Sequence, residues 1–311
     1  MSRRSALWAL AAGIAALASS CGGGTTTGSS SHLIAFSSDR ALPPRSEAAD
    51  FDTRRLDLYL MNVDGSHLER LTRNGLTDVF PAVSRDGRRV AFTRDIGGYA
   101  QVFVLDLRDH SVRMLTHAHA NSGLPAWSPD SSLIAFATDR DAPGGDVIYV
   151  MNADGSGQRA VTRNLPRVND AWPSWSPDGK RLVFARETGA GSAIYTVGIG
   201  GDDLRRLTRD TNALDTQPAW SPDGKEIAFE SDVFMLPGQI YAMRPDGTKR
   251  RQLTDPTRGA SSRPSWSSDG RLIVFMASRE HHTDVWVMNA DGSHQMQLTR
   301  NHGFAGFPGA A

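Results

Sequence analysis

The heptapeptide Pro-Ala-Trp-Ser-Pro-Asp-Gly at residues 218–224 decides the fold, because close copies of it recur along the chain. The other copies lie at residues 81–87, 125–131, 173–179 and 264–270. Their leading prolines are 44, 48, 45 and 46 residues apart. A period of this length is typical of the four-stranded blades of a β-propeller. The sequence therefore predicts an all-β ring of repeated blades.

Two apolar segments follow each copy of the phrase. The first reads Ile-Ala-Phe or a close variant and begins at residues 34, 90, 134, 182, 227 and 273. The second contains an aromatic residue, as in Ile148-Tyr149-Val150-Met151, and a short segment ending in Leu-Thr or Val-Thr completes the repeat. Both apolar segments are continuous rather than alternating, which is typical of strands in a sheet with two buried faces. We therefore expect four antiparallel strands in each blade.

The two ends of the chain predict how the ring closes. The first repeat begins near His32 with its Ile-Ala-Phe strand and has no innermost strand before it. The segment at residues 307–310 parallels residues 80–83, and Pro308 lies 44 residues after Pro264. We therefore predict a six-bladed propeller over residues 32–311, in which the C-terminal strand completes blade one.

The charge balance argues against a nucleic-acid partner. Lys plus Arg and Asp plus Glu number 34 each, and removal of Arg3 and Arg4 with a leader leaves 32 against 34. Binding to nucleic acid requires a basic face that displaces counterions. A chain with 39% hydrophobic residues can instead bury the core of one large domain, for which we expect a monomer.

The first twenty residues read as a signal peptide. Arg3 and Arg4 form the charged start, residues 6–17 the apolar run, and Ala18-Ser19-Ser20 the cleavage region. A membrane span is the alternative, but twelve apolar residues fall short of the roughly 20 needed to cross a bilayer. Residues 21–31, rich in Gly, Ser and Thr, are predicted to form a flexible tether.

Cys21 is the single cysteine of the chain, which excludes an internal disulfide. Residues 17–21 resemble the lipobox of bacterial lipoproteins, which implies a lipidated Cys21 and a lipid anchor on the periplasmic side of the outer membrane. Ala18 stands where that family prefers leucine, and Ala18-x-Ser20 also fits the ordinary signal peptidase. A soluble periplasmic or secreted protein is therefore the alternative.

The linked motifs of the repeat resemble those of the TolB family. These are the phrase PAWSPDG, a following IYVMNADG-like segment and a final Leu-Thr, and together they cover about residues 31–311. The resemblance implies a six-bladed propeller that binds an envelope protein. TolB carries an N-terminal α/β domain, whereas here the tether leads directly into blade one, so we expect a propeller without that domain.

Candidate binding residues lie where each innermost strand begins, three residues before the phrase. Loops between the second and third strands, among them residues 93–101 and 187–193, share that face and vary from blade to blade, which favours recognition there. Carboxylates near the axis suit Ca²⁺ or another divalent cation, although each could instead cap its own turn. His117 and His119 form a metal pair only if a third ligand joins them. The candidates are Asp78, Ser122, Asp170, Asp215, Ser261, His117 and His119.

Two functional hypotheses follow. The chain has no Gly-x-Ser-x-Gly motif, so we nominate no catalytic residue, no required cofactor and no assigned metal site. The leading hypothesis is a non-enzymatic, exported scaffold that binds a protein or an envelope polymer through its variable loops. The second is a metal-dependent, carbohydrate-active propeller, as implied by a resemblance to lyases of pectic oligosaccharides.

Overall fold

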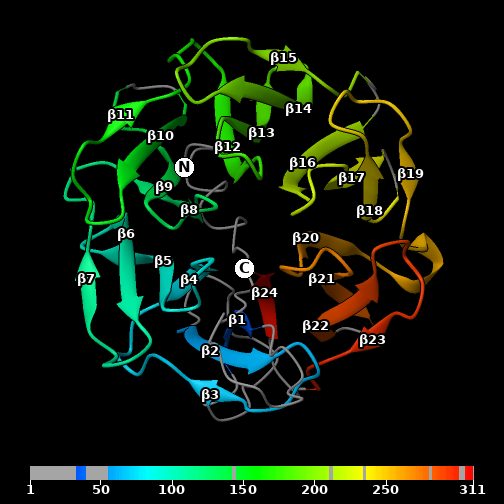
Figure 1. Cartoon of the computed structure of the whole chain (residues 1–311), viewed down its shortest axis with the longest axis horizontal. Helices are drawn as coiled ribbons and strands as arrows, with labels where there is room; N and C mark the ends of the chain where they lie inside the picture. Colours follow the sequence, from blue (N-terminus) through cyan, green and yellow to red (C-terminus); the bar gives the residue numbers. More distant parts are fainter. Residues whose placement is uncertain are drawn as a thin grey trace.

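The computed structural model describes residues 33–39, 55–141, 145–209, 213–233, 236–279, 282–300 and 305–310, with side chains described only to residue 306 in the last segment. These residues form six four-stranded antiparallel sheets around a central axis (Figure 1). This confirms the predicted six-bladed all-β propeller. The predicted signal peptide, the tether and Cys21 lie outside the described residues.

Each blade contains one strand from each of four layers, counted outward from the axis. The innermost strands are β4 (Asp78–Val83), β8 (Ser122–Trp127), β12 (Asn169–Trp175), β16 (Ala213–Trp220), β20 (Ser261–Trp266) and β24 (Ala305–Ala310). The second strands are β1 (Leu33–Ser38), β5 (Arg89–Ile96), β9 (Leu133–Thr138), β13 (Arg181–Thr188), β17 (Ile227–Val233) and β21 (Leu272–Arg279).

The two outer layers follow in the same order around the ring. The third strands are β2 (Asp57–Asn62), β6 (Tyr99–Asp106), β10 (Val147–Asn152), β14 (Gly191–Gly198), β18 (Gln239–Met243) and β22 (His282–Asn289). The outermost strands are β3 (Glu69–Arg70), β7 (Val112–Met114), β11 (Arg159–Ala160), β15 (Arg205–Arg206), β19 (Arg251–Gln252) and β23 (Met296–Gln297). One short 3-10 helix, η2 (Pro256–Arg258), precedes β20.

Strand β24 closes the ring as predicted, because it pairs with β1 to give a sheet of order β24-β1-β2-β3. Its register places Ala310 opposite Ile34 and Ala305 opposite Ser38. In Figure 1 the red β24 lies beside the blue β1, so the two ends of the propeller share one blade. Ala305 is completely buried at the start of this strand.

The core of each blade is built from the predicted apolar segments. The phenylalanine of each second strand is fully buried and packs against an aromatic ring of the third strand, with ring centroids 5.6–6.5 Å apart. Because each face of a blade contacts a neighbouring blade, these strands are apolar on both faces. The six phenylalanines are Phe36, Phe92, Phe136, Phe184, Phe229 and Phe275.

The threonine that ends each repeat has a repeated role. Its Oγ1 accepts a hydrogen bond from the backbone N–H of the residue that begins the second apolar segment of the repeat, such as Ile148, at 2.9–3.0 Å in all six blades. This bond satisfies a buried donor where the outermost strand stops. The threonines are Thr72, Thr116, Thr162, Thr208, Thr254 and Thr299.

Two predicted loops are instead strand extensions. Pairing of β5 with β6 runs from Arg89 and Asp106 to Ile96 and Tyr99, so only Gly97-Gly98 separates the strands. Both glycines have positive φ, which matches the twist of a two-residue hairpin turn. Residues 187–193 are likewise mostly paired between β13 and β14. Within the described part of the chain, no helix is long and apolar enough to cross a membrane.

Candidate functional site

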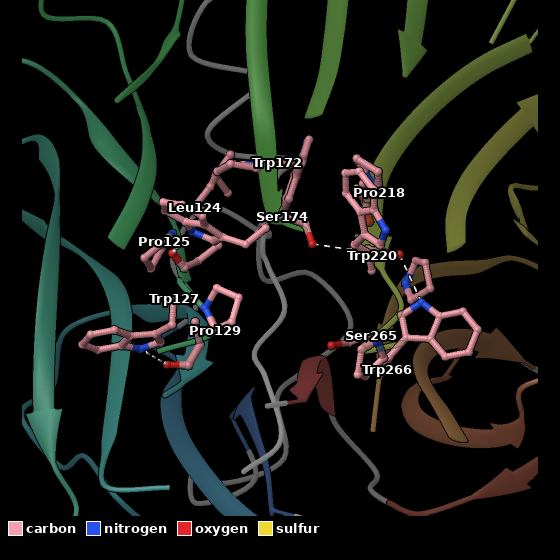
Figure 2. A pocket seen from close by; sticks show the side chains of 18 of the residues that line it. Leu124, Pro125, Trp127, Pro129, Trp172, Ser174, Pro218, Trp220, Ser265 and Trp266 are labelled. Carbon is pink, nitrogen blue, oxygen red and sulfur yellow. Dashed lines mark hydrogen bonds between the residues drawn. The ribbon is translucent and has the colours of Figure 1, made fainter. Parts of the chain in front are cut away.

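The described residues line an open cavity of about 250 Å³ on the propeller axis. It extends from the middle of the innermost strands to the Ser-Pro turns at their ends, because Pro129, Pro177 and Pro222 line it. Five of the seven tryptophans of the chain contribute to its wall, and Figure 2 shows four of them around the opening. We call this cavity the axial cup. Its wall is the repeated phrase itself.

A bulge in each innermost strand shapes the cup. The residue before the leading proline has a left-handed backbone, with φ between 53° and 60°, and the ladder to the second strand shifts register there. A left-handed conformation costs about 1–2 kcal/mol for a residue with a Cβ, so it persists only where the surrounding fold imposes it. The five residues are Phe80, Leu124, Trp172, Gln217 and Arg263, and all line the cup.

The phrase tryptophans hold neighbouring blades together. The indole Nε1 of Trp127 donates to the carbonyl oxygen of Ala82 at 2.9 Å, across the boundary between blades two and three. Trp175 and Trp266 make the equivalent bond to the preceding blade, at 3.0 and 3.1 Å. Trp220 differs, because its indole bonds to Gly224 in its own turn at 3.4 Å.

This difference supplies a matched pair of substitutions. We expect Trp175→Phe to lower the free energy of unfolding by about 0.5–1.5 kcal/mol, because it removes a partly buried hydrogen bond between two blades. Trp220→Phe removes only a long bond within one turn, so its cost should be smaller. Urea unfolding of both variants measures the difference. Equal losses would contradict an inter-blade role for the Trp175 indole.

Three residues from alternate blades meet at the floor of the cup. The rings of Phe80 and Trp172 contact edge to face with centroids 5.5 Å apart. The guanidinium of Arg263 lies 4.9 Å from the Trp172 ring and 6.0 Å from that of Phe80. Burial lowers the pKa of Arg263 to about 9, although the nearby Glu230 opposes this effect. The floor is therefore a cation held on aromatic rings.

The acid that acts on this cation is Glu230, whose charge raises the pKa of Arg263. Burial raises the pKa of Glu230 to about 7, while the charge of Arg263 acts in the opposite direction. Its Oε2 is buried and makes no hydrogen bond among the described residues. The corresponding position in the other blades holds a residue without charge, such as Thr93 or Ala137. Sequence analysis missed Glu230 because a single charged residue in an apolar strand has no repeat to mark it.

The predicted acidic residues do not line the cup. Asp78, Asp170 and Asp215 lie within the first three residues of their strands, close to the predicted position, but all three are fully buried. Asp78 accepts two hydrogen bonds from Arg94, at 2.5 and 2.8 Å, and Asp170 accepts two from Arg186, at 2.6 and 2.7 Å. Asp215 pairs with Arg250 at 3.4 Å. Each carboxylate thus has a cation within its own blade.

The arginines of these pairs also stack on the core rings. The Arg94 guanidinium lies 5.0 Å from the Phe92 ring, and that of Arg186 lies 5.5 Å from the Phe184 ring. Sequence analysis did not select these arginines. The available signal was an arginine two residues after the repeated phenylalanine, in Phe92-Thr93-Arg94 and Phe184-Ala185-Arg186. An acid and a base in adjacent strands then form one buried unit.

The two predicted serines, Ser122 and Ser261, stand where other blades have the buried aspartates, but each meets an arginine through a neutral hydroxyl. Ser122 Oγ lies 3.3 Å from Nη2 of Arg140, and Ser261 Oγ accepts from Nη2 of Arg279 at 2.9 Å. His117 and His119 are exposed, and His119 contacts the edge of the Tyr99 ring at a centroid distance of 5.9 Å. Across the described ranges, no three His, Cys, Asp or Glu residues form a group that could hold a metal ion.

Asp146, which directly precedes β10 on the variable-loop face, provides a test of how stability depends on pH. It is 6% exposed, and burial together with the charges of Asp139 and Asp170 raises its pKa to about 7. The folded state therefore binds this proton more tightly than the unfolded chain, so stability contributed by the protonated form is lost as pH rises from about 4 to above 7. The cost is about 1.4 kcal/mol for each unit of pKa shift.

We accordingly expect Asp146→Asn to be more stable than the parent chain at pH 8 and equally stable near pH 4. Thermal unfolding at several pH values measures this convergence. The exposed Asp95, changed to Asn, serves as the control and should leave the pH profile unaltered. A constant offset between parent and Asp146→Asn across the range would contradict the assignment.

Fold and site together define a closed six-bladed propeller whose concave surface is formed by its own repeated phrase. The chain belongs to the TolB beta propeller domain family, whose profile matches residues 48–141 and 125–306. This confirms the resemblance seen in the repeated motifs.

Curated relatives carry the same family name. The chain is 31% identical over 111 residues to a protein TolB homolog of Chlorobaculum tepidum, a match covering 36% of this chain and 25% of the relative. It is 28% identical over 108 residues to the Tol-Pal system protein TolB of Desulfosudis oleivorans, covering 35% of this chain and 24% of that protein. The matched segments therefore span about a quarter of each relative.

Among solved structures, TolB from Acinetobacter baumannii superposes with a TM-score of 0.74 and 22% sequence identity. The match covers 89% of this chain and 66% of that one. This similarity supports the fold.

Proposed function

We propose that this chain is an exported, non-enzymatic scaffold that binds a protein of the bacterial envelope. The carrying observation is the axial cup, a concave surface of tryptophan and proline on a rigid ring. Rigid aromatic surfaces of this kind are typical of protein recognition sites. Membership of the TolB family, one of whose relatives is named as a Tol-Pal system protein, supports a protein partner in the envelope.

We place partner binding at the axial cup rather than on the variable-loop face expected from the sequence. On that loop face the predicted carboxylates are neutralised within their own blades. The cup instead combines an apolar wall with the guanidinium groups of Arg85 and Arg263. Concave apolar surfaces with a few polar groups are where binding sites usually lie.

A capture experiment tests both the function and the face. The full mature chain is immobilised, and bound proteins from an envelope extract are identified by mass spectrometry. Ala126→Trp fills the cup, because Ala126 lines it and is half-buried. Tyr99→Ala alters an exposed side chain at the tip of the β5–β6 hairpin on the opposite face. Thermal unfolding first establishes that both variants remain folded, and Ala219→Trp replaces Ala126→Trp if that variant does not.

Specific proteins recovered with the parent chain and with Tyr99→Ala, but lost with the filled cup, would support the proposal. Loss with Tyr99→Ala alone would move the partner to the variable loops. Recovery of glycan or another envelope polymer without protein would overturn the protein-binding function.

We also propose that Cys21 anchors the mature chain to the membrane. Two or more acyl chains make such an anchor stable, at about 0.8 kcal/mol for each buried CH₂. Cys21→Ser should then shift the protein from the membrane fraction to the soluble fraction of the host cell. A parent chain found only in the soluble fraction would overturn the anchor and leave the scaffold function intact.

A further inference from the structure

Arg85 introduces a charge into the wall of the axial cup at a position where the repeat usually has none. It lines the cup where three other copies of the phrase have Pro129, Pro177 and Pro222 and the fourth has Ser268. Its Nη2 donates to the backbone oxygen of Ser268 at 3.0 Å, which ties blade two to blade six. Its side chain is half-buried, and burial lowers its pKa.

The wall of the cup does not neutralise this guanidinium. Among the described residues that line the cup, the charged ones are Arg85 and Arg263, and none is acidic. No carboxylate of the described residues lies within ion-pairing distance of Arg85. The adjacent Asp86 pairs with Arg89 instead, at 3.6 Å. A guanidinium has five donors in a planar fork and binds a carboxylate through two of them, so Arg85 retains donors for an incoming anion.

A second polar group in the wall of the cup, the side-chain amide of Gln217, has an acceptor atom without a donor among the described residues. The Oε1 atom of Gln217 is buried and has no hydrogen-bond partner among the described residues. Gln217 lines the cup and has the left-handed backbone of the bulge, with φ of 53°. A buried amide oxygen without a partner destabilises the fold, and a backbone N–H of an entering chain would satisfy it.

The wall favours a peptide over a sugar. Three of the phrase tryptophans are only 5–8% exposed, and their indole N–H groups are engaged between blades. Trp172 is covered by Arg263 and Phe80. Four of the five tryptophans of the cup are thus engaged by other protein groups, and the fifth, Trp220, is half-buried, so the wall offers a sugar little open aromatic face on which to stack. The prolines and tryptophans of the wall instead give an apolar surface suited to an extended apolar segment. The three are Trp127, Trp175 and Trp266.

From this geometry we infer that the axial cup receives an extended segment of the partner protein that carries a carboxylate, which pairs with Arg85 while a backbone N–H of the segment bonds to Gln217. The carboxylate belongs either to an acidic side chain or to the C-terminus of the segment, and both offer the same fork to the guanidinium. This inference rests on the proposed function, because it specifies the chemistry of the partner.

Linear peptide libraries of about twelve residues, one with free and one with amidated C-termini, test the inference against the full mature chain. Peptides selected by the parent chain are synthesised, and their dissociation constants are measured by fluorescence anisotropy. We expect enrichment of Asp and Glu in both libraries if the carboxylate is a side chain, and selection only from the free-ended library if it is terminal. Binding should weaken as salt rises from about 50 to 500 mM, because exposed ion pairs are screened.

Arg85→Pro is the decisive variant, because it restores the residue found in three sister turns, and no hydrogen bond from the Arg85 backbone N–H is lost. We expect it to weaken binding of the selected acidic peptide about 10- to 100-fold, as for loss of a charged hydrogen bond. Arg85→Gln is the second variant. The exposed Arg88, changed to Gln, is the matched control in the same turn.

The outcomes separate this inference from the proposed function. If Arg85→Pro binds the peptide as well as Arg88→Gln does, or if the selected peptides show no carboxylate preference, the inference is overturned. Capture of an envelope protein that is lost with Ala126→Trp but kept with Arg85→Pro would overturn it while leaving the scaffold function standing. If neither variant affects capture, the partner does not bind at the cup, and both the placement of binding there and the carboxylate inference are wrong.

Discussion

Replacing Arg186 with methionine is expected to destabilise the propeller by about 3–5 kcal/mol, because it leaves the Asp170 carboxylate buried without its cation. Asp170 is fully buried, and Arg186 supplies two short hydrogen bonds to it. Methionine retains the apolar contact with the core rings but none of the donors. Urea unfolding, read as the midpoint at constant slope, measures the loss.

The chain supplies its own control for this substitution. Arg279 plays the corresponding part in blade six, although it lies two residues further along its strand than Arg186 does, and its bonds go to Ser261 and to the backbone oxygens of Ala260 and Ser278. Arg279→Met leaves no buried charge without a partner, so we expect the free energy of unfolding to fall by only about 1 kcal/mol. Asp170→Asn added to Arg186→Met should recover part of the lost stability, because it removes the unpaired charge. Equal effects in the two blades would show that packing, rather than charge, governs both sites.

Removal of residues 305–311 should have a still larger effect. The loss of β24 leaves blade one with three strands and exposes the inner edge of β1, where Ile34 and Phe36 are fully buried. Burying one such side chain contributes about 1.5–3 kcal/mol, and several ladder hydrogen bonds are lost as well. The total is comparable to the whole stability of a domain, about 5–15 kcal/mol. We expect the truncated chain to lose cooperative unfolding or to unfold at less than half the original urea concentration.

A peptide of residues 305–311 added in trans tests whether this effect comes from the missing strand. It should restore part of the midpoint, whereas a scrambled peptide of the same composition should not. A truncated chain with the midpoint of the full chain would show that closure by β24 contributes nothing to the fold.

The repeated features of the fold were predictable because each is encoded by a short sequence motif that occurs several times in the chain. Pro-Asp-Gly turns, continuous apolar strands and Leu-Thr endings specify elements through the conformational preferences of neighbouring residues. The closing strand was also predictable, because residues 307–310 match residues 80–83. The predicted loop at residues 93–101 was wrong, because Gly97-Gly98 forms a two-residue turn and lets the flanking strands pair to their ends.

The candidate site was harder to predict, because it depends on residues from different blades. The acidic positions were found, but not their partners Arg94 and Arg186, which lie on the adjacent strand, each 16 residues after its acid. The same place in the other blades holds an uncharged residue, so this spacing is not repeated around the ring. The floor of the cup combines one residue from each of three alternate blades, Phe80, Trp172 and Arg263. Local pattern contains no information about which side chains meet across the axis.

The amino-acid sequence by itself determined the number of blades, the order of strands and the place of closure, because repetition and turn chemistry act over a few residues. Only the tertiary structure decided which groups are neutralised and which face a cavity. The reason is that burial and ion pairing depend on the distance between strands of the closed ring. Asp78 pairs with Arg94 on the adjacent strand, whereas Arg85 lines the cup without a carboxylate partner among the described residues.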